Sequence, residues 1–135
     1  MERLYDGFER ALLASAPLFQ RLGLARAERP VAALERALKG ALFDCRMCGQ
    51  CVLSSTGMSC PMNCPKNLRN GPCGGVRGDG NCEVYPEMPC VWVKAYEGSR
   101  LMVRGDKIAE PQPAIDHRLK GQSSWLAVLR ARSVA

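Results

Sequence analysis

C-R-M-C-G-Q-C at residues 45–51 opens the stretch of sequence on which the fold of this chain depends. The stretch continues with C-P-M-N-C-P-K-N-L-R-N-G-P-C-G-G at residues 60–75 and closes with G-N-C-E-V-Y-P-E-M-P-C at residues 80–90. All eight cysteines of the 135-residue chain lie within it: Cys45, Cys48, Cys51, Cys60, Cys64, Cys73, Cys82 and Cys90. Few other residues there are large and apolar, and seven glycines with five prolines disfavour long helices and strands. A hydrophobic core cannot hold such a segment together, so either disulfides or bound metal must do so.

The N-terminal sequence favours metal over disulfides. Residues 1–24 carry Glu2, Asp6 and Glu9, and basic residues and a proline interrupt their apolar side chains, so they contain no signal-peptide hydrophobic region. No apolar run approaches membrane-spanning length. We therefore expect a cytoplasmic protein with no membrane partner, and in a reducing cytosol clustered cysteines more often bind metal. A secreted disulfide framework is the alternative.

The net charge of +6 becomes modest once metal ligation is counted. A four-thiolate site that holds zinc or an oxidised cubane cluster carries about −2, so two such sites would bring the protein to about +2. A nucleic-acid zinc finger would need histidine ligands or a basic surface laced with aromatic residues. The single histidine, His117, lies outside the cysteine stretch and is expected at the surface. We expect no nucleic-acid partner.

Helical patterns flank the cysteine stretch on both sides. Apolar residues recur with a helical period in residues 2–16 and again in residues 30–43, where Pro30 suits a first helical turn. These two helices predict a hairpin or an arm that docks onto a partner. Residues 91–102 are also predicted to be helical, with Trp92 and Tyr96 on one face as packing residues.

Three consecutive parts are therefore expected: a helical hairpin or docking arm at residues 1–44, a cysteine-rich metal-binding module at 45–102, and a linker with a short helix at 103–135. Ser123 or Ser124 can cap that last helix. The expected fold class is a small, metal-stabilised, irregular cysteine-rich domain with flanking α-helices, made mainly of helix and loop. No Gly-rich phosphate loop, nucleophile elbow or acidic pair stands out, so we expect a non-catalytic subunit without catalytic residues of its own.

The spacing Cys45-x2-Cys48-x2-Cys51 favours an iron–sulfur cluster over zinc. Three cysteines at i, i+3 and i+6 wrap a loop around one body and present three thiolates to three iron corners of a cubane, with a fourth ligand from far along the chain. Structural zinc more often uses paired C-x2-C knuckles, and the remaining cysteines form no further pair of that kind. Zinc is the alternative metal.

Eight thiolates fill two four-cysteine sites with none left over. One partition places Cys45, Cys48, Cys51 and Cys90 in the first site, and Cys60, Cys64, Cys73 and Cys82 in the second. In an interleaved arrangement, Cys60 or Cys64 completes the first site instead. A polar side chain such as Gln50 could also replace a thiolate. The spacing alone leaves these arrangements open.

The cysteine stretch resembles a known family. Residues 45–75, with their N-G-P-C-G-G element, and residues 80–92 are closely similar to the methylenetetrahydrofolate reductase C-terminal domain, the cysteine-rich module of the MetV-type small subunit. The tail L-K-G-Q-S-S-W-L at residues 119–126 resembles the ending of that family, whereas residues 1–44 are not covered. The resemblance implies that all eight cysteines are ligands of [4Fe–4S] clusters. It also implies that Asn70–Gly75 is a tight backbone segment at a cluster or an interface.

The resemblance further implies a partner, a barrel-shaped, flavin-containing subunit that reduces methylenetetrahydrofolate to methyltetrahydrofolate. We therefore expect an accessory iron–sulfur electron-transfer subunit with two [4Fe–4S] clusters, which relays electrons between a further donor and that flavin. Burial by Trp92 and Tyr96 and positive charge from Lys66, Arg69 and Lys94 would tune the clusters. The alternative is a structural zinc-binding subunit that stabilises the reductase without carrying electrons.

Overall fold

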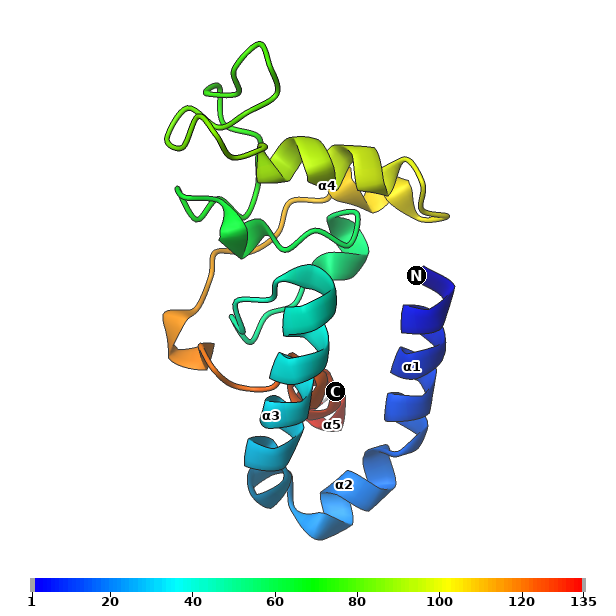
Figure 1. Ribbon diagram of the computed structural model, residues 1–135. Coiled ribbons are helices and arrows are strands. Elements are labelled where there is room, and N and C mark those ends of the chain that lie inside the picture. The colour runs from blue at the N-terminus through cyan, green and yellow to red at the C-terminus, as the bar shows by residue number, and fades with distance from the viewer. Residues whose placement is uncertain (1, 135) are drawn as a thin grey trace. The chain divides into compact units, whose positions relative to one another are not determined.

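The structure is a computed structural model that describes residues 2–134 of the chain, with side chains described for residues 3–131. Its α-helices are α1 (Glu2–Ala14), α2 (Ala16–Leu22), α3 (Leu24–Phe43), α4 (Val91–Ser99) and α5 (Ser124–Val134), as Figure 1 shows. Short 3-10 helices are η1 (Leu53–Ser55), η2 (Pro61–Asn63), η3 (Gly105–Ala109) and η4 (His117–Leu119). Within residues 2–134, strand-like pairing is limited to the isolated bridges Val76–Cys82 and Asn81–Pro89. The prediction of a mainly helix-and-loop chain is confirmed.

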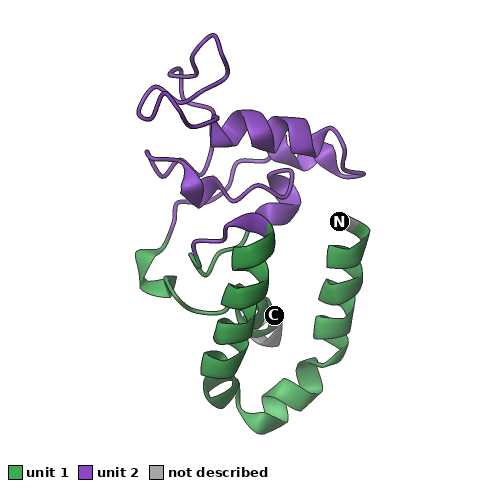
Figure 2. Cartoon of the chain, viewed as in Figure 1, with its two compact units in different colours: residues 1–42, 47–51, 116–135 green, residues 43–46, 52–115 purple. Residues whose placement is uncertain are grey.

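The chain divides into two compact units that alternate along the sequence (Figure 2). Unit 1 comprises residues 1–42, 47–51 and 116–135, and unit 2 comprises residues 43–46 and 52–115. The cysteine stretch is therefore shared, because residues 47–51 belong to unit 1 and the rest of the stretch to unit 2. The three parts expected from the sequence are consecutive along the chain, whereas these units are not.

Unit 1 is built from α1, α2, α3 and α5. In Figure 1, α1 and α3 run alongside each other and α2 joins them. The core consists of four buried residues, with apolar side chains of α1, α2 and α3 packed around them: Leu12, Trp125, Leu126 and Leu129. The Phe8 ring lies 4.5 Å from the Trp125 ring, so α1 and α5 meet through an aromatic pair.

The helix predicted over residues 2–16 divides at Ser15. The Ser15 hydroxyl donates to the Leu12 carbonyl at 2.7 Å, which satisfies a carbonyl at the end of α1. Pro17 then falls in the first turn of α2, where a missing N–H has no cost. Because the fixed φ of proline suits a first helical turn, Pro17 starts a new helix and does not merely end the first one.

The expectation that Pro30 begins a helix is wrong. Helix α3 begins at Leu24, after Gly23 with φ +84°, and Pro30 lies inside it. An internal proline removes a hydrogen bond and costs about 3 kcal/mol. Leu24, Ala27 and Val31 all pack against the unit 1 core, so tertiary packing extends the helix on both sides of the proline.

The prediction of a capped C-terminal helix is confirmed. The Leu126 N–H donates to the Ser123 hydroxyl at 3.2 Å, which makes Ser123 the N-cap of α5. Trp125, Leu126 and Leu129 are buried on its inner face. This helix is therefore held by both its cap and its packing.

Unit 2 consists mostly of loops arranged around α4. Trp92 is buried, and its indole N–H donates to the Leu68 carbonyl at 3.2 Å, so its predicted packing role is confirmed. Tyr96 is 58% exposed, and its predicted packing role is wrong. The buried face of α4 centres on Ala95, which leaves Tyr96 beyond its edge.

No helix in residues 2–134 combines the length and the apolar character needed to cross a membrane.

Candidate metal centre

All eight cysteines are free thiols, and none is on the exposed surface. Four are buried and four are half-buried: Cys60, Cys64, Cys82 and Cys90 in the first group, and Cys45, Cys48, Cys51 and Cys73 in the second. Two of the eight, Cys48 and Cys51, belong to unit 1, and the other six belong to unit 2. A thiol that is shielded from water in a loop can serve either as a metal ligand or as a packing group. The contacts around each cysteine distinguish these two roles.

The best-defined thiol pair is Cys45 and Cys60, both in unit 2. A hydrogen bond with Cys45 lowers the pKa of Cys60 to about 6, against the opposing effect of burial. Backbone hydrogen bonds from Arg46 and Met62 lower it further, while the nearby Asp44 carboxylate raises it. Two thiols in contact, with amides directed at one sulfur, form the environment that a metal-bound thiolate requires.

Local sequence explains how this pair is held. Pro61 starts the short helix η2 directly after Cys60, which stiffens the chain at the sulfur. The Asn63 amide donates to the Asp44 carbonyl at 2.9 Å and accepts a hydrogen bond from Arg46. The loop that carries Cys45 is thereby fastened to the helix that follows Cys60.

Cys48 and Cys51 lie in a loop of unit 1 that residues 116–121 fasten at several points. Gly121 N–H donates to the Met47 carbonyl at 2.7 Å, and Asp116 N–H donates to the Gln50 side-chain oxygen at 2.7 Å. The side-chain oxygen of Gln50, considered above as a substitute ligand, is thus engaged by the backbone.

Gly49 is required in this loop. Its φ is +78°, a left-handed conformation that favours glycine. A Cβ atom there would lie 2.8 Å from the Leu119 Cβ, closer than side chains approach. The glycine between Cys48 and Cys51 therefore permits close packing against η4.

The remaining ligand candidates lie in the loops of unit 2. Cys82 N–H donates to the Met88 carbonyl at 2.9 Å, and Cys90 N–H donates to the Gly80 carbonyl at 3.0 Å. These two hydrogen bonds hold the segment around Cys82 next to the segment around Cys90. Cys90 also packs with Trp92 and Ala95 in a small buried cluster, so Trp92 shields this cysteine from water.

Cys73 lies beside a positive charge. Lys66 forms an ion pair with Glu83. Its hydrogen bond with Glu83 raises the pKa of Lys66, and the negative charge of Cys73 raises it further. Arg69 is buried, and its Nε donates to the Pro113 carbonyl at 3.0 Å. Lys94 is exposed. Of the three cations expected to act on a cluster, Lys66 therefore interacts with Cys73.

The segment Asn70–Gly75 is held tightly by its neighbours. The Asn70 amide donates to the Gln112 carbonyl at 2.8 Å and accepts from the Gln112 N–H at 2.7 Å. A Cβ on Gly71 would lie 2.5 Å from the Trp92 ring, so only glycine fits against the indole. The N-G-P-C-G-G element therefore places Cys73 on a backbone anchored to both Gln112 and α4.

Across residues 2–134, no three side chains among histidine, cysteine, aspartate and glutamate are arranged as a metal-binding group. His117 is exposed in η4, as expected. The donors fit thiolate-binding metals by chemistry, as the Cys45–Cys60 pair and its amides illustrate. Metal binding would have to bring further thiolates to that pair.

Sequence reasoning missed a buried polar cluster in unit 1. Glu35 and Lys39 are 1% and 2% exposed, and the Lys39 ammonium lies 2.7 Å from the Glu35 carboxylate and 2.8 Å from the Ser124 hydroxyl. Ser123 donates to Glu35 at 2.6 Å. The sequence does show Glu35 and Lys39 at positions i and i+4 within residues 31–42. Such a spacing is, however, typical of an ion pair on the exposed face of a helix. Burial of the pair could not be read from it.

The comparisons agree with the resemblance carried by the cysteines. A family model described as "Methylene-tetrahydrofolate reductase C terminal" matches residues 24–118. The match begins at the first residue of α3, so it includes a helix that the resemblance did not cover. No curated protein and no solved structure matches the chain. Because the match spans more than half of the sequence, the chain belongs to the methylene-tetrahydrofolate reductase C-terminal family.

Proposed function

We propose that this chain is an accessory iron–sulfur subunit that transfers electrons to or from the flavin of a methylenetetrahydrofolate reductase. The observation that carries the proposal is the contact between Cys45 and Cys60, with backbone hydrogen bonds from Arg46 and Met62 to the Cys60 sulfur. Amide–sulfur hydrogen bonds are one of the means by which proteins adjust cluster potentials. Family membership supplies the link to methylenetetrahydrofolate reductase.

All eight cysteines are the proposed ligands of two [4Fe–4S] clusters. The contact of Cys45 with Cys60 supports the interleaved arrangement, in which these two cysteines share one site. A bound cluster would supply one-electron chemistry. Hydride transfer and folate binding would belong to the flavin-containing catalytic partner, and this chain would contribute no catalytic residue.

The chain's own residues would control the surroundings of the sulfurs. Trp92 excludes water from Cys90, and Lys66 brings positive charge to Cys73. Exclusion of water and nearby positive charge both change the reduction potential of a negatively charged cluster. Tyr96 is too exposed to share this role in the chain by itself.

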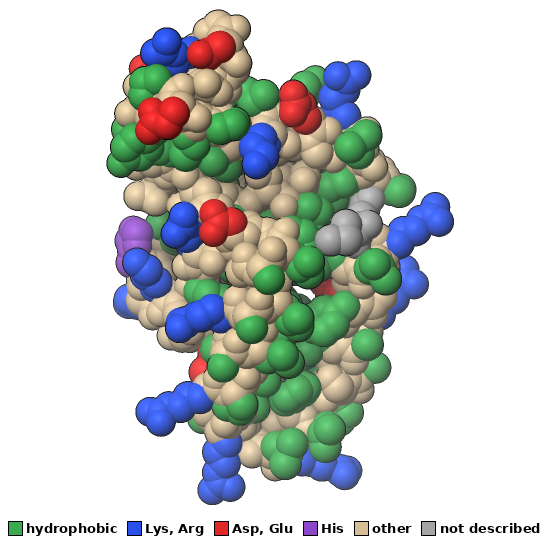
Figure 3. All heavy atoms as spheres, in the orientation of Figure 1, with side chains coloured by type: hydrophobic (Ala, Val, Ile, Leu, Met, Phe, Trp, Pro, Cys, Tyr) green, Lys and Arg blue, Asp and Glu red, His purple; other side chains and the backbone are tan. Residues whose placement is uncertain are grey.

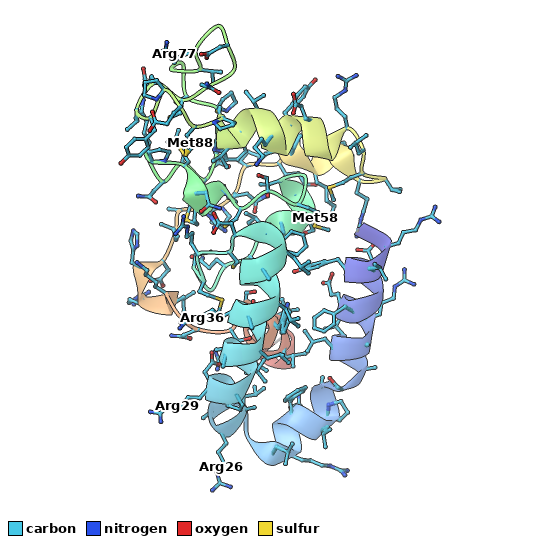
Figure 4. The ribbon with its side chains drawn as sticks, viewed as in Figure 1. Arg26, Arg29, Arg36, Met58, Arg77 and Met88 are labelled. Atoms are coloured by element: carbon cyan, nitrogen blue, oxygen red, sulfur yellow. The ribbon has the colours of Figure 1, made fainter. Side chains whose placement is uncertain are left out.

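A row of exposed leucines on α3 supports the proposed partner. Leu34, Leu38 and Leu42 are 56%, 45% and 59% exposed at i, i+4 and i+8. Figure 3 shows hydrophobic side chains gathered over the helices of unit 1, while Figure 4 shows Arg26, Arg29 and Arg36 extending away from α3. An apolar helix face bordered by charges is typical of a protein-binding surface. The catalytic subunit is its proposed occupant, consistent with the docking arm expected from the sequence.

The metal can be identified directly. The chain would be co-expressed with its catalytic subunit, purified without air, and analysed for iron, acid-labile sulfide and zinc. Iron and sulfide in equal amounts, with brown colour and a signal in electron paramagnetic resonance after reduction, would support the proposal. A colourless protein with stoichiometric zinc would refute it and support the structural zinc subunit instead.

A further inference from the structure

Cys51 is in contact with the helices of unit 1 through Tyr5. The Tyr5 hydroxyl lies 3.8 Å from the Cys51 sulfur, within hydrogen-bonding range for sulfur. Tyr5 is on α1, outside residues 24–118 that match the family. The contact therefore joins a proposed ligand to a helix that the family match does not include.

The direction of this hydrogen bond follows from the chemistry of a ligand sulfur. A thiolate that binds a metal carries no proton, so the Tyr5 hydroxyl donates to the Cys51 sulfur. Lys39 lies on the other side of the tyrosine, with its ammonium nitrogen 5.8 Å from the centre of the Tyr5 ring. A buried positive charge therefore lies next to the residue that donates to the thiolate.

Lys39 is fixed in place as a buried cation. Its ammonium group is bound to Glu35 and Ser124, and it lies 5.1 Å from the centre of the Trp125 ring. Burial alone would lower the pKa of Lys39, but the negative charges of Cys51 and Glu35 outweigh it and raise the pKa above its ordinary value. Glu35 accepts from Ser123 and Ser124 as well, so its charge is shared among several donors.

We propose that Tyr5 and Lys39 are positioning residues that form an outer shell around Cys51, Tyr5 as a hydrogen-bond donor and Lys39 as a buried positive charge, and raise the reduction potential of the metal centre that Cys51 binds. The inference rests on the proposed function for the identity of that centre. An added electron increases the negative charge on the ligand sulfurs, so a donor such as the Tyr5 hydroxyl interacts more strongly with the reduced state. The charge of Lys39 acts in the same direction.

The test is Tyr5→Phe in the full chain, purified anaerobically with its catalytic partner. Tyr5→Phe removes the hydroxyl and keeps the ring. Tyr96→Phe is the matched control, since it removes the same group from an exposed tyrosine on α4. The reduction potential would be measured by titration monitored with electron paramagnetic resonance. The rate of metal release to a chelator would be measured on the same samples.

We expect Tyr5→Phe to shift the reduction equilibrium about tenfold toward the oxidised state, which is about 59 mV for one electron. Metal release should also become faster, while Tyr96→Phe should match the wild type in both measurements. A bound iron–sulfur cluster with unchanged potential and release rate in Tyr5→Phe would overturn the inference and leave the proposed function intact. If the wild type contains zinc, the proposed function fails. Faster zinc release from Tyr5→Phe would still support the shell, and an unchanged rate would overturn it.

Discussion

At the scale of single residues, the thiol pair Cys45 and Cys60 makes the proposed ligand sets testable. Cys60→Ala should remove one of two clusters, so that iron per chain falls by about half. Ser59→Ala is the matched control, because it changes the adjacent residue without removing a sulfur. Iron, sulfide and the visible absorbance band would be measured on anaerobic samples. A variant with the full iron content would remove Cys60 from the ligand set.

If Cys45 and Cys60 share a site, Cys45→Ala should lose the same cluster as Cys60→Ala. The two variants would then give the same remaining signal in electron paramagnetic resonance, and the double variant would lose no more iron than either alone. Two different remaining signals would favour the partition that places these cysteines in separate sites.

The contribution of the Asp116 carboxyl to the stability of the fold should depend on pH. Asp116 is also the residue whose backbone N–H donates to Gln50. Hydrogen bonds from Arg118, at 2.7 and 2.9 Å, lower the pKa of its carboxyl from 3.8 to about 2. Because the folded pKa is depressed, this contribution to stability is complete above about pH 4 and is lost as the pH falls through about 2. Arg118→Gln should return the pKa toward 3.8, as measured by titration of the carboxyl carbon shift. Arg26→Gln, at an exposed position on α3, should leave it unchanged.

At the scale of elements, the packing of α4 reverses an ordinary helix preference. Gly98 lies in α4, where alanine would normally stabilise by about 1 kcal/mol. A Cβ on Gly98 would, however, lie 3.1 Å from the Gly57 Cα and closer still to the Gly57 carbonyl. We therefore expect Gly98→Ala to destabilise unit 2 by about 1–3 kcal/mol.

The matched control for this prediction is Gly40→Ala in α3. Nothing lies within 4 Å of a Cβ built on Gly40, so the substitution should stabilise by about 0.5–1 kcal/mol. Urea unfolding of both variants would measure the two free-energy changes. A stabilised Gly98→Ala variant would mean that α4 does not approach the Gly57 loop as described.

The leucine row on α3 makes a second prediction about an element. Leu38→Glu places a charge in the middle of the row and should weaken binding to the catalytic subunit about tenfold or more, without unfolding α3. Leu101→Glu, at a residue that is 90% exposed in unit 2, is the control. Calorimetric titration of each variant with the catalytic subunit would measure the dissociation constants. Equal loss of affinity in both variants would exclude a specific role for α3.

The local apolar pattern predicted which segments form helices better than it predicted where each helix begins and ends. Apolar spacing located α1, α3, α4 and α5, and the two serines before Trp125 were the predicted N-cap candidates, of which Ser123 is the cap. Pro30 misplaced the start of α3, because local propensity favours proline in a first turn while core packing decides the helix length. Tyr96 was misjudged for a similar reason, since a helical period does not show where the edge of a buried face falls.

At the scale of the whole molecule, the sequence could not show which distant segments meet. The loop that carries Cys48 and Cys51 is fastened by Asp116, 66 residues after Gln50, and Glu35 binds Ser123, 88 residues later. Such contacts depend on tertiary packing and leave no periodic signal. Cysteine spacing therefore indicated which residues would form the proposed site, and structure was needed to bring Cys45 to Cys60 and Tyr5 to Cys51.

Metal removal should affect the two units differently. Unit 1 has a hydrophobic core around Leu12 and Leu126, whereas the loops of unit 2 have few large apolar side chains and would depend on thiolate ligation. After anaerobic chelation, we expect the amides of Cys82 and Cys90 to lose protection from hydrogen exchange. The amide of Leu126, bonded to the Ser123 cap, should keep it.

The control for metal removal is a sample taken through the same steps without chelator, measured by hydrogen exchange with mass spectrometry. Returning iron and sulfide should restore protection around Cys82 and Cys90, because ligation and folding are linked. Protection that is equally strong in the loops before and after complete metal removal would mean that packing around Trp92 suffices to order unit 2. Loss of protection throughout both units would instead show that the helices of unit 1 also require the metal.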